Sequence, residues 1–489
     1  MKRGTNKKDS ERKKTNQRSS SGRESGGSES RGSESNTRSY KREILLTSMI
    51  ITIIVGITAT GAYFGLQQGR VGENEEPTTP EVMSQDVELN VENEEDVAED
   101  ATGQEVDDTP EQELIEEPEV TEIRIQFAGD VLMHSGFGIV DVARIGEDTY
   151  DFRPYLRDIA PFIDGDLAII NMETPVDALG GNQGIATFPR FNVPFEILEA
   201  LQYAGFNHLI SANNHSFDMG WEGLINTVAS FERAGINHTG VHTTEEEFHS
   251  PTILDVNGIQ VGIIAYTDSA NGLESLIPYD ALPWAMRRFQ SHVMDDVPAM
   301  SEDIAHLREE GAQLVIVALH WGAEYVDEPT LMQREIARAL CDAGADVIMG
   351  KHSHSPQPLE WHYRSDGSRA LIMYSLGNFL ADQTRISDAN VLAQVNSGFH
   401  VTQYGMLVSL DVVKDEEGEI QLVHADVIPT LCMRDFAGNT LFTVDAVSVM
   451  PVFGGELPEF VEDEDLRYWG RRAYEHLVWI VGEEFIRRY

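Results

Sequence analysis

The chain alternates short runs of apolar residues with longer stretches in which apolar residues recur every three or four positions. The short runs predict β-strands, because their length and branched aliphatic content are typical of strands buried in a sheet. The longer stretches predict amphipathic helices. The expected strands are residues 123–130, 166–173, 207–215, 261–268, 313–321, 345–354 and 370–378, and the clearest helices are residues 195–205, 223–235 and 331–344. Strands and helices in regular alternation predict an α/β fold.

Three segments with other patterns precede the first expected strand. Residues 1–43 contain 13 Lys and Arg, 6 Asp and Glu and almost no apolar side chains, so we expect a basic, disordered segment. Residues 44–66 are 23 residues without a charge. This is long enough for a transmembrane helix, and a cleaved signal peptide is the alternative. Residues 67–120 contain 20 Asp and Glu and one Arg, which predicts an extended, acidic, disordered linker.

The charges around residues 44–66 predict the orientation of the chain. The basic residues precede the apolar segment, so the positive-inside rule places the N-terminus in the cytoplasm and the C-terminal domain outside the cell. The protein is then a single-pass protein of the cell membrane. The whole chain has a formal net charge of −46, and residues 121–489 are themselves strongly acidic. Such a charge excludes nucleic acid as an expected partner, because phosphate backbones bind basic surfaces.

Nearly every expected strand ends in a side chain that can bind a metal ion or transfer a proton. These residues are Asp130, Asn171, Glu173, Asn214, His215, Asp268, His320, His352, His354 and Asn378. Each of them alone has a plain structural explanation, such as a turn aspartate or a core histidine. Loops at the carboxyl ends of strands converge in open α/β sheets, so together they indicate one shared site. In "GKHSH" (350–354) we expect both histidines to project to the same side, because side chains alternate along an extended strand.

The residue types indicate the chemistry of this site. Carboxylates, an amide and imidazoles without any thiolate suit divalent Mn, Fe or Zn. Two such ions that share a carboxylate can clamp a phosphoryl group and generate hydroxide, and a nearby histidine can protonate the leaving group. Asn171, Asp268 and Asn378 are candidates to support the ligands or contact substrate. Four residues close in sequence are further candidates for that role: His134, Trp321, Glu324 and Lys351.

Five motifs in this order resemble the CapA family of capsule and poly-γ-glutamate biosynthesis proteins, which is related to calcineurin-like metallophosphatases. The motifs are "FAGDVLMH", "NMETP", "SANNHSFDMG", the segment from "HWGAEY" to "GKHSHSPQP", and "YSLGNF". The resemblance covers roughly residues 122–435. It implies a metallophosphatase-like four-layer αββα sandwich with a two-metal centre, in a domain that we delimit as residues 121–435.

The resemblance also implies roles for individual residues. The implied metal ligands are Asp130, Glu173, Asn214, His320, His352 and His354, with Glu173 bridging two ions, and His215 is the implied general acid. The chain departs from the phosphatase pattern in three places. Glu173 replaces an aspartate, His134 follows Asp130 by four positions instead of two, and Lys351 stands where the family often has histidine. The family further implies action beside polyglutamate synthetase or export subunits, on an anionic surface polymer or a phosphoester.

Residues 436–489 form a C-terminal extension. Apolar residues at spacings of three and four near its end predict an amphipathic helix packed on the domain, and a docking surface for a membrane partner is the alternative.

Three functions remain open from the sequence. The first is a metal-dependent hydrolase of the CapA type. The second is a non-catalytic assembly or export component of a polymer synthetase complex, in which the metal site is structural or vestigial. The third is a surface-binding module without metal, in which the histidines sense pH. Metal content and turnover distinguish these functions.

Overall fold

The computed structural model describes residues 120–135, 138–176, 184–383, 402–435, 446–458 and 464–487. The expected basic segment and transmembrane helix, and the expected linker up to residue 119, lie outside these ranges. Among the helices of the described ranges, none is both long and apolar enough to cross a bilayer.

The first sheet has eight strands and carries the amino-terminal half of the site. Its strands are β1 (Thr121–Leu132), β2 (Leu167–Met172), β3 (His208–Ile210), β4 (Asn237–Thr239), β11 (Asn378–Ala381), β12 (Tyr404–Lys414), β13 (Ile420–Asp435) and β14 (Ala446–Pro451). Their order is β14-β13-β12-β1-β2-β3-β4, and β11 pairs with β1. Strands β1 to β4 are parallel, so the carboxyl ends of β1, β2 and β3 lie at the same edge.

The second sheet has six strands and carries the carboxyl-terminal half of the site. Its strands are β5 (Thr252–Val256), β6 (Ile259–Thr267), β7 (Leu314–His320), β8 (Val347–Lys351), β9 (Leu359–Tyr363) and β10 (Arg369–Met373), in the order β5-β6-β7-β8-β10-β9. The four central strands are parallel, and β5 and β9 are antiparallel strands at the two edges.

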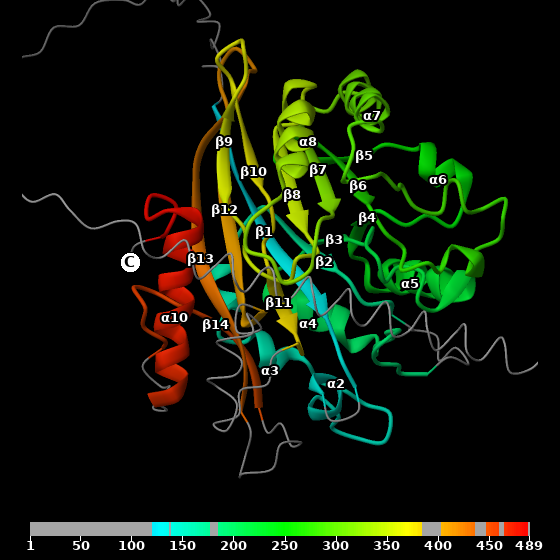
Figure 1. The fold of residues 1–489 in the computed structure, drawn as a ribbon, viewed down its shortest axis with the longest axis vertical. Coiled ribbons are helices and arrows are strands. Elements are labelled where there is room, and N and C mark those ends of the chain that lie inside the picture. Colours follow the sequence, from blue (N-terminus) through cyan, green and yellow to red (C-terminus); the bar gives the residue numbers. More distant parts are fainter. Residues whose placement is uncertain are drawn as a thin grey trace, which may run out of the picture. The chain divides into compact units, whose positions relative to one another are not determined.

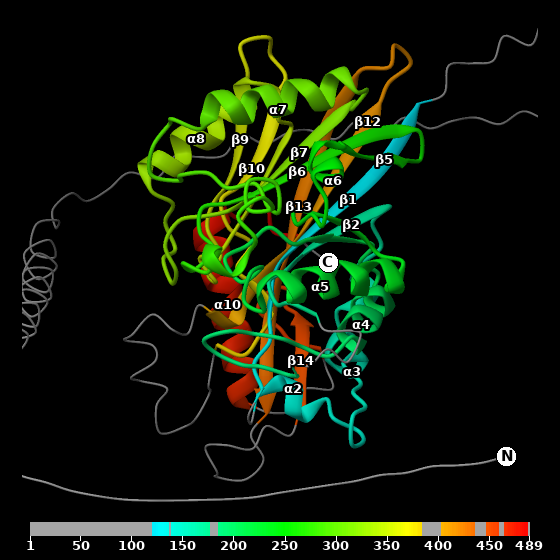
Figure 2. The ribbon, with the colours of Figure 1, turned by 90° about the vertical axis from the view of Figure 1, so that its right-hand side faces the viewer.

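In the described ranges, eight helices surround the two sheets (Figures 1 and 2). They are α2 (Ile139–Val142), α3 (Arg153–Leu156), α4 (Glu196–Ala204), α5 (Gly220–Ala234), α6 (Glu245–His249), α7 (Val297–Glu309), α8 (Leu331–Asp342) and α10 (Glu464–Val481). Of these, α2, α3 and α4 cover the outer face of the first sheet, and α7 and α8 cover that of the second. Short 3-10 turns span Ala160–Phe162 and Glu274–Leu276.

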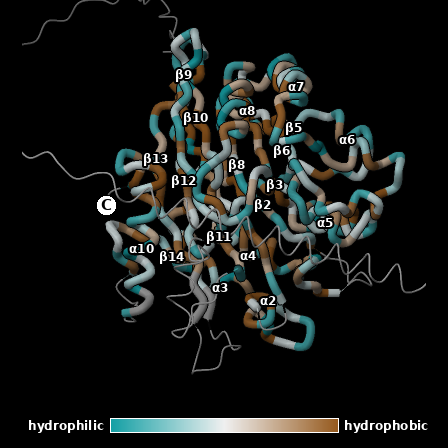
Figure 3. The backbone as a smooth tube through the Cα atoms, in the orientation of Figure 1, coloured by the Kyte–Doolittle hydropathy of each residue, from teal (hydrophilic) through white to brown (hydrophobic). Residues whose placement is uncertain are grey.

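Alternate residues of a strand point to opposite faces of its sheet and are buried in different hydrophobic cores. On β7, Ile316 and Ala318 face the first sheet, in a core that both sheets share. Their neighbours Val315 and Val317 pack against α7 and α8. The outer face of the first sheet packs against α3 and α4 in the same way. The layers therefore run helix, sheet, sheet, helix, and hydrophobic residues lie along both the strands and the helices (Figure 3).

Helix α10 packs on the domain through its apolar face. Trp469, Ala473 and Leu477 recur every four residues, and all three are buried in the core that the two sheets share. After the helix, the chain pairs with β13, since the amide of Val427 donates to the carbonyl of Phe485 at 2.7 Å. The first sheet also continues beyond residue 435, because β14 pairs with β13.

The α/β class is confirmed, and the seven expected strands and three clearest helices are all present. Three expected strands are shorter than their apolar runs, and one of them, the run at 370–378, ends as a strand at Met373. The run at 207–215 forms a strand only at His208–Ile210, and the run at 345–354 ends as a strand at Lys351. In both, the residues that follow the strand are the site residues.

Candidate metal centre

The side chains of seven predicted site residues meet where the carboxyl ends of the two sheets face each other. Asp130 lies in β1, Glu173 directly follows β2, and Asn214 and His215 follow β3. His320 ends β7, and His352 and His354 follow β8. Three groups have ligand atoms within 4.8 Å of one another, and every member except Glu324 is buried. They are Asp130, Glu173 and His354; Glu173, His320 and His352; and Glu324, His352 and His354.

Glu173 lies at the centre of this cluster and belongs to two of the three groups. Its side chain is fully buried, and neither carboxylate oxygen has a hydrogen-bond partner in the described residues. Its Oε1 lies 3.5 Å from His320 Nε2 and 3.8 Å from His354 Nε2. Burial, and then the charge of Asp130, raise the pKa of Glu173 well above its usual range. A buried carboxylate without partners is costly, and bound cations remove that cost.

Asp130 is held on both oxygens. Asn171 donates to its Oδ1 at 2.7 Å, and His354 Nδ1 lies 3.2 Å from its Oδ2. Burial alone would raise the pKa of Asp130, but His354 and the Asn171 hydrogen bond outweigh it and lower the pKa. At His354, burial would lower the pKa of the ring, but the charges of Glu173 and Asp130 outweigh it and raise the pKa to about 9. The Oδ1 atom of Asn378 lies 3.0 Å from Nδ1 of His354 and fixes the orientation of that ring.

Two further imidazoles and an amide form the other side of the cluster. The Oδ1 atom of Asn214 lies 2.9 Å from His320 Nε2, and the rings of His320 and His352 have centroids 4.6 Å apart. Burial, and then the neighbouring histidine, lower the pKa of His320 well below its usual range and also lower that of His352. Both side chains are therefore neutral imidazoles, which is the form that binds metal. Their Nδ1 atoms have no hydrogen-bond partner among the described residues.

The two histidines after β8 reach the site by a route other than the expected one. His352 and His354 have φ angles of 97° and 56°, so the segment is a tight turn and not an extended strand. The explanation from strand alternation is wrong, although both rings do enter the cluster, with centroids 6.0 Å apart. Positive φ is unfavourable for a histidine, and such strain concentrates at functional sites.

His215 has a partner that the sequence reasoning missed. Its Nδ1 lies 2.8 Å from Oδ2 of Asp218, a fully buried residue three positions later, and the same oxygen accepts the amide of Phe191 at 2.7 Å. The Phe191 ring stands edge-on to both His215 and His134, at 4.7 and 4.8 Å. His134 therefore lies beside the site, separated from His215 by an aromatic ring, and belongs to none of the three groups. The spacing in "HSFD" was the signal for Asp218.

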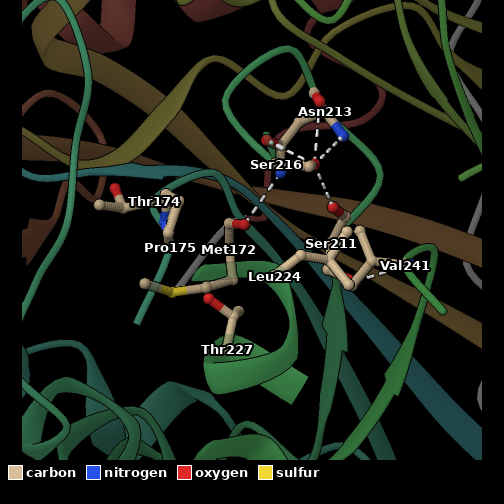
Figure 4. A pocket seen from close by; sticks show the side chains of 9 residues that line it. All are labelled: Met172, Thr174, Pro175, Ser211, Asn213, Ser216, Leu224, Thr227 and Val241. Carbon is tan, nitrogen blue, oxygen red and sulfur yellow. Dashed lines mark hydrogen bonds between the residues drawn. The ribbon is translucent and has the colours of Figure 1, made fainter. Parts of the chain in front are cut away.

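The loop that carries Asn214 and His215 is fixed to the end of β2 (Figure 4). The hydroxyl of Ser216 donates to the carbonyl of Ser211 at 2.6 Å. Asn213 Nδ2 donates to the carbonyl of Met172 at 2.9 Å, and its Oδ1 accepts the amide of His215 at 3.1 Å. The cavity of about 10 Å³ beside them has room for one water molecule. Asn213, which the sequence reasoning did not select, thus couples the position of His215 to that of Glu173.

Lys351 and Asp268 belong to the second sheet or follow it directly, and each fixes a loop beside the site. Lys351 is fully buried, and its Nζ donates to the carbonyl of Ala212 at 2.9 Å, which joins β8 to the loop after β3. Burial lowers the pKa of Lys351 to about 7, although the charges of the nearby carboxylates act in the opposite direction. Asp268 accepts the amide of Gly322 at 3.1 Å and so fixes the loop after β7.

Trp321, which we expected to support the site or contact substrate, packs in the core behind the site. It follows His320, whose ring enters the cluster, so on an extended strand it points to the opposite face. Its ring is buried in the core beneath α7 and α8, and its Nε1 donates to the carbonyl of Tyr374 at 3.2 Å.

The family model for the bacterial capsule synthesis protein PGA_cap matches residues 124–383, more than half of the chain. The chain belongs to this family. "Capsule biosynthesis protein CapA" of Bacillus anthracis is 28% identical over 299 residues, which cover 60% of this chain and 66% of the relative. "PGA biosynthesis protein CapA" of Bacillus subtilis (strain 168) is 31% identical over 198 residues, covering 40% and 48%. This PGA_cap protein thus spans less than two thirds of either relative.

Among solved structures, the PGA_cap protein is similar to the NAD nucleotidase NadN of Haemophilus influenzae. The two chains share 13% sequence identity, and the similarity covers 76% of this chain and 64% of that one. The TM-score is 0.36.

Proposed function

We propose that this protein is an extracytoplasmic, membrane-anchored member of the CapA type, which hydrolyses a phosphoryl or related ester at a two-metal centre during capsule or poly-γ-glutamate synthesis or export. The observation that carries the proposal is the arrangement around Glu173. A fully buried carboxylate that makes no hydrogen bond with the described residues lies between two sets of ligand atoms, in the place of a ligand shared by two cations. Two ions sharing a carboxylate are typical of phosphoryl-transfer sites.

The donors divide into two positions. Asp130, Glu173 and His354 would hold one ion. Glu173, His320 and His352 would hold the other, with the Asn214 amide oxygen as a fourth donor. Oxygen and imidazole donors without a thiolate fit Mn, Fe or Zn. When bound, a pair of such ions polarises the ester and supplies an activated water.

His215 is placed to complete the reaction by proton transfer. Its Nδ1–H donates to the Asp218 carboxylate, which fixes the tautomer and leaves Nε2 as the second nitrogen of the ring. In the protonated ring, Nε2–H can donate its proton to the oxygen of the leaving group, while Asp218 stabilises the positive charge. The Phe191 ring against His215 limits its rotation.

The biological setting is part of the proposal. The names of the relatives refer to capsule and PGA biosynthesis, and the apolar residues 44–66 would anchor the chain with its acidic domain outside the cell. An acidic domain repels an anionic polymer, so divalent ions or salt at the membrane surface would screen the two charges. A synthetase or export subunit in the same membrane is the expected partner.

The test is metal analysis of the full-length protein, purified in detergent, with turnover of p-nitrophenyl phosphate measured on the same samples. We expect about two ions per chain, as in two-metal hydrolases, and loss of both metal and turnover in His352→Ala. His362→Ala is the matched control, because His362 pairs with Asp342 outside the cluster. Metal without turnover in the wild type would favour the non-catalytic assembly role, and wild type without metal would overturn the proposal.

A further inference from the structure

Glu324 is the exposed member of a group whose other two members are buried histidines. It lies in the loop after β7, and its carboxylate, a nitrogen of His352 and a nitrogen of His354 lie within 4.8 Å of one another. His352 is 8% exposed, and its Nδ1 has no hydrogen-bond partner in the described part of the chain. A carboxylate and two imidazoles whose ligand atoms lie this close form a donor set that suits a divalent cation.

The loop holds Glu324 in this position from both sides. Before it, the Gly322 amide donates to the Asp268 carboxylate at 3.1 Å. After it, the Tyr325 amide donates to the carbonyl of Ser353, between the two histidines, at 2.7 Å. Tyr325 has a φ of 64°, and its hydroxyl bonds to Glu324; burial and this carboxylate raise the pKa of Tyr325. A surface glutamate without a role needs none of these restraints.

Gly322 shows that the course of this loop is tightly specified. It has a φ of 93°, where glycine is favoured, and a Cβ at this position would lie 2.5 Å from Nε2 of Gln333. Gln333 belongs to the capping box of α8. The loop therefore lies directly against the start of that helix, which leaves Glu324 little freedom to move away from the histidines.

Without Glu324, the two proposed metal positions have different numbers of protein donors. Among the described residues, the position at His320 has four protein donors, Glu173 and Asn214 among them, whereas the position at His354 has three. Two divalent ions also carry four positive charges, of which Asp130 and Glu173 neutralise two. A third carboxylate at the His354 position would make the donor numbers equal and would reduce the excess positive charge from two to one.

We propose that Glu324 is the outer ligand of the ion held by His354. This inference rests on the proposed two-metal site and adds a donor that lies outside the ligand set expected from the sequence. Because Glu324 is the exposed donor, it marks the side of the centre that faces solvent. It is also the ligand that an anionic substrate oxygen can displace without disturbing the buried donors.

Metal titration of the full-length protein in detergent tests this assignment. The chelator-treated wild type and Glu324→Gln are titrated with Mn²⁺ by calorimetry, and with Co²⁺ by visible absorption, which reports coordination. We expect two binding steps in the wild type. In Glu324→Gln we expect the weaker step to lose affinity about tenfold or more. We also expect the stronger step to be unchanged, and the Co²⁺ spectrum to change only at the second equivalent.

Glu328→Gln is the matched control. Glu328 lies four residues further on, pairs with Arg334 at 3.0 Å, and loses the same charge on substitution. Two ions bound with unchanged affinities in Glu324→Gln would overturn the inference and leave the proposed function intact. An equal loss in Glu328→Gln would overturn it too, by showing a general charge effect. A wild type that binds no Mn²⁺ or Co²⁺ would remove the proposed function itself.

Discussion

A neighbouring carboxylate without a hydrogen-bond partner distinguishes a histidine of the metal centre from a histidine of the core. His208 and His320 are both fully buried at strand ends. His208 makes a 3.0 Å hydrogen bond to the Thr239 hydroxyl, its Nδ1 has no partner among the described residues, and none of the three groups found there includes it. His320 faces the Glu173 carboxylate, which has no partner of its own among the described residues. Burial alone therefore does not identify a ligand, whereas burial beside an unsatisfied carboxylate does.

His208 should make the fold sensitive to acid. Burial lowers its pKa from 6.5 to about 3, so the folded state stays neutral at pH values where the unfolded chain takes up a proton. The contribution of the neutral His208 side chain to the free energy of unfolding is complete above pH 6.5 and is lost as the pH falls towards 3. Between pH 7 and pH 5 we expect a loss of about 2 kcal/mol from this group.

Urea unfolding of metal-free protein at both pH values measures this loss. In His208→Gln, which keeps an amide donor for Thr239, the decrease between pH 7 and pH 5 should be smaller by that amount. An identical pH dependence in the two proteins would show that His208 is protonated in the folded state.

Asp218 should act on the reaction through His215. In Asp218→Asn the side-chain oxygen can still accept both hydrogen bonds, but the charge that stabilises protonated His215 is gone. We expect kcat to fall about tenfold to a hundredfold, with metal content and KM little changed. The loss should be larger for phenyl phosphate than for p-nitrophenyl phosphate, because nitrophenolate leaves with less need of a proton. Equal losses for both substrates would assign Asp218 a purely structural role.

At the scale of elements, the sequence predicted the position of the site better than it predicted the backbone conformation of the loops that form it. Apolar runs that end in Asp, Asn or His identified the carboxyl ends of the strands, because both the strand and its polar end are local in sequence. The left-handed turn at His352 and His354 was missed, since "KHSH" contains no glycine to signal it. The packing of Trp321 was not predicted, because the core beneath α7 and α8 that surrounds it is formed by residues distant in sequence.

Helix α10 should contribute to stability through its buried face alone. Leu477 is completely buried, whereas Trp479, two residues later, is 68% exposed. Leu477→Ala should lower the free energy of unfolding by about 2–5 kcal/mol, because it leaves a cavity in the core. Trp479→Ala, although it removes a larger side chain, should change it by less than about 1 kcal/mol. Chemical denaturation of the two variants compares them, and equal effects would show that the helix is only loosely attached.

At the scale of the whole molecule, the ligand set joins two sheets that pack through side chains. The first sheet supplies Asp130, Glu173 and Asn214, and the second supplies His320, His352 and His354. The motif order contained all six residues, but the long antiparallel pair of β12 and β13 that widens the first sheet was not predicted. Those strands have no chemical motif, and their pairing is set by the rest of the sheet.

Because its ligands come from both sheets, the metal centre should act as a cross-link for the whole domain. Ions that bind only the folded state stabilise it by RT ln(1 + [L]/Kd), or about 4 kcal/mol at a thousandfold excess over Kd. Mn²⁺ added to chelator-treated protein should therefore raise the Tm by several degrees. The apo fold also bears the cost of the buried Glu173 carboxyl, which the ions relieve.

Glu173→Gln separates these two effects. It removes the shared ligand and the buried charge together, so the metal-free variant should be at least as stable as the metal-free wild type and should gain little from Mn²⁺. Differential scanning calorimetry with and without Mn²⁺ gives all four values. A variant that still gains the full increase in Tm would show that the stabilising ion binds without Glu173. In that case the two halves of the site are held together by packing and not by a shared carboxylate.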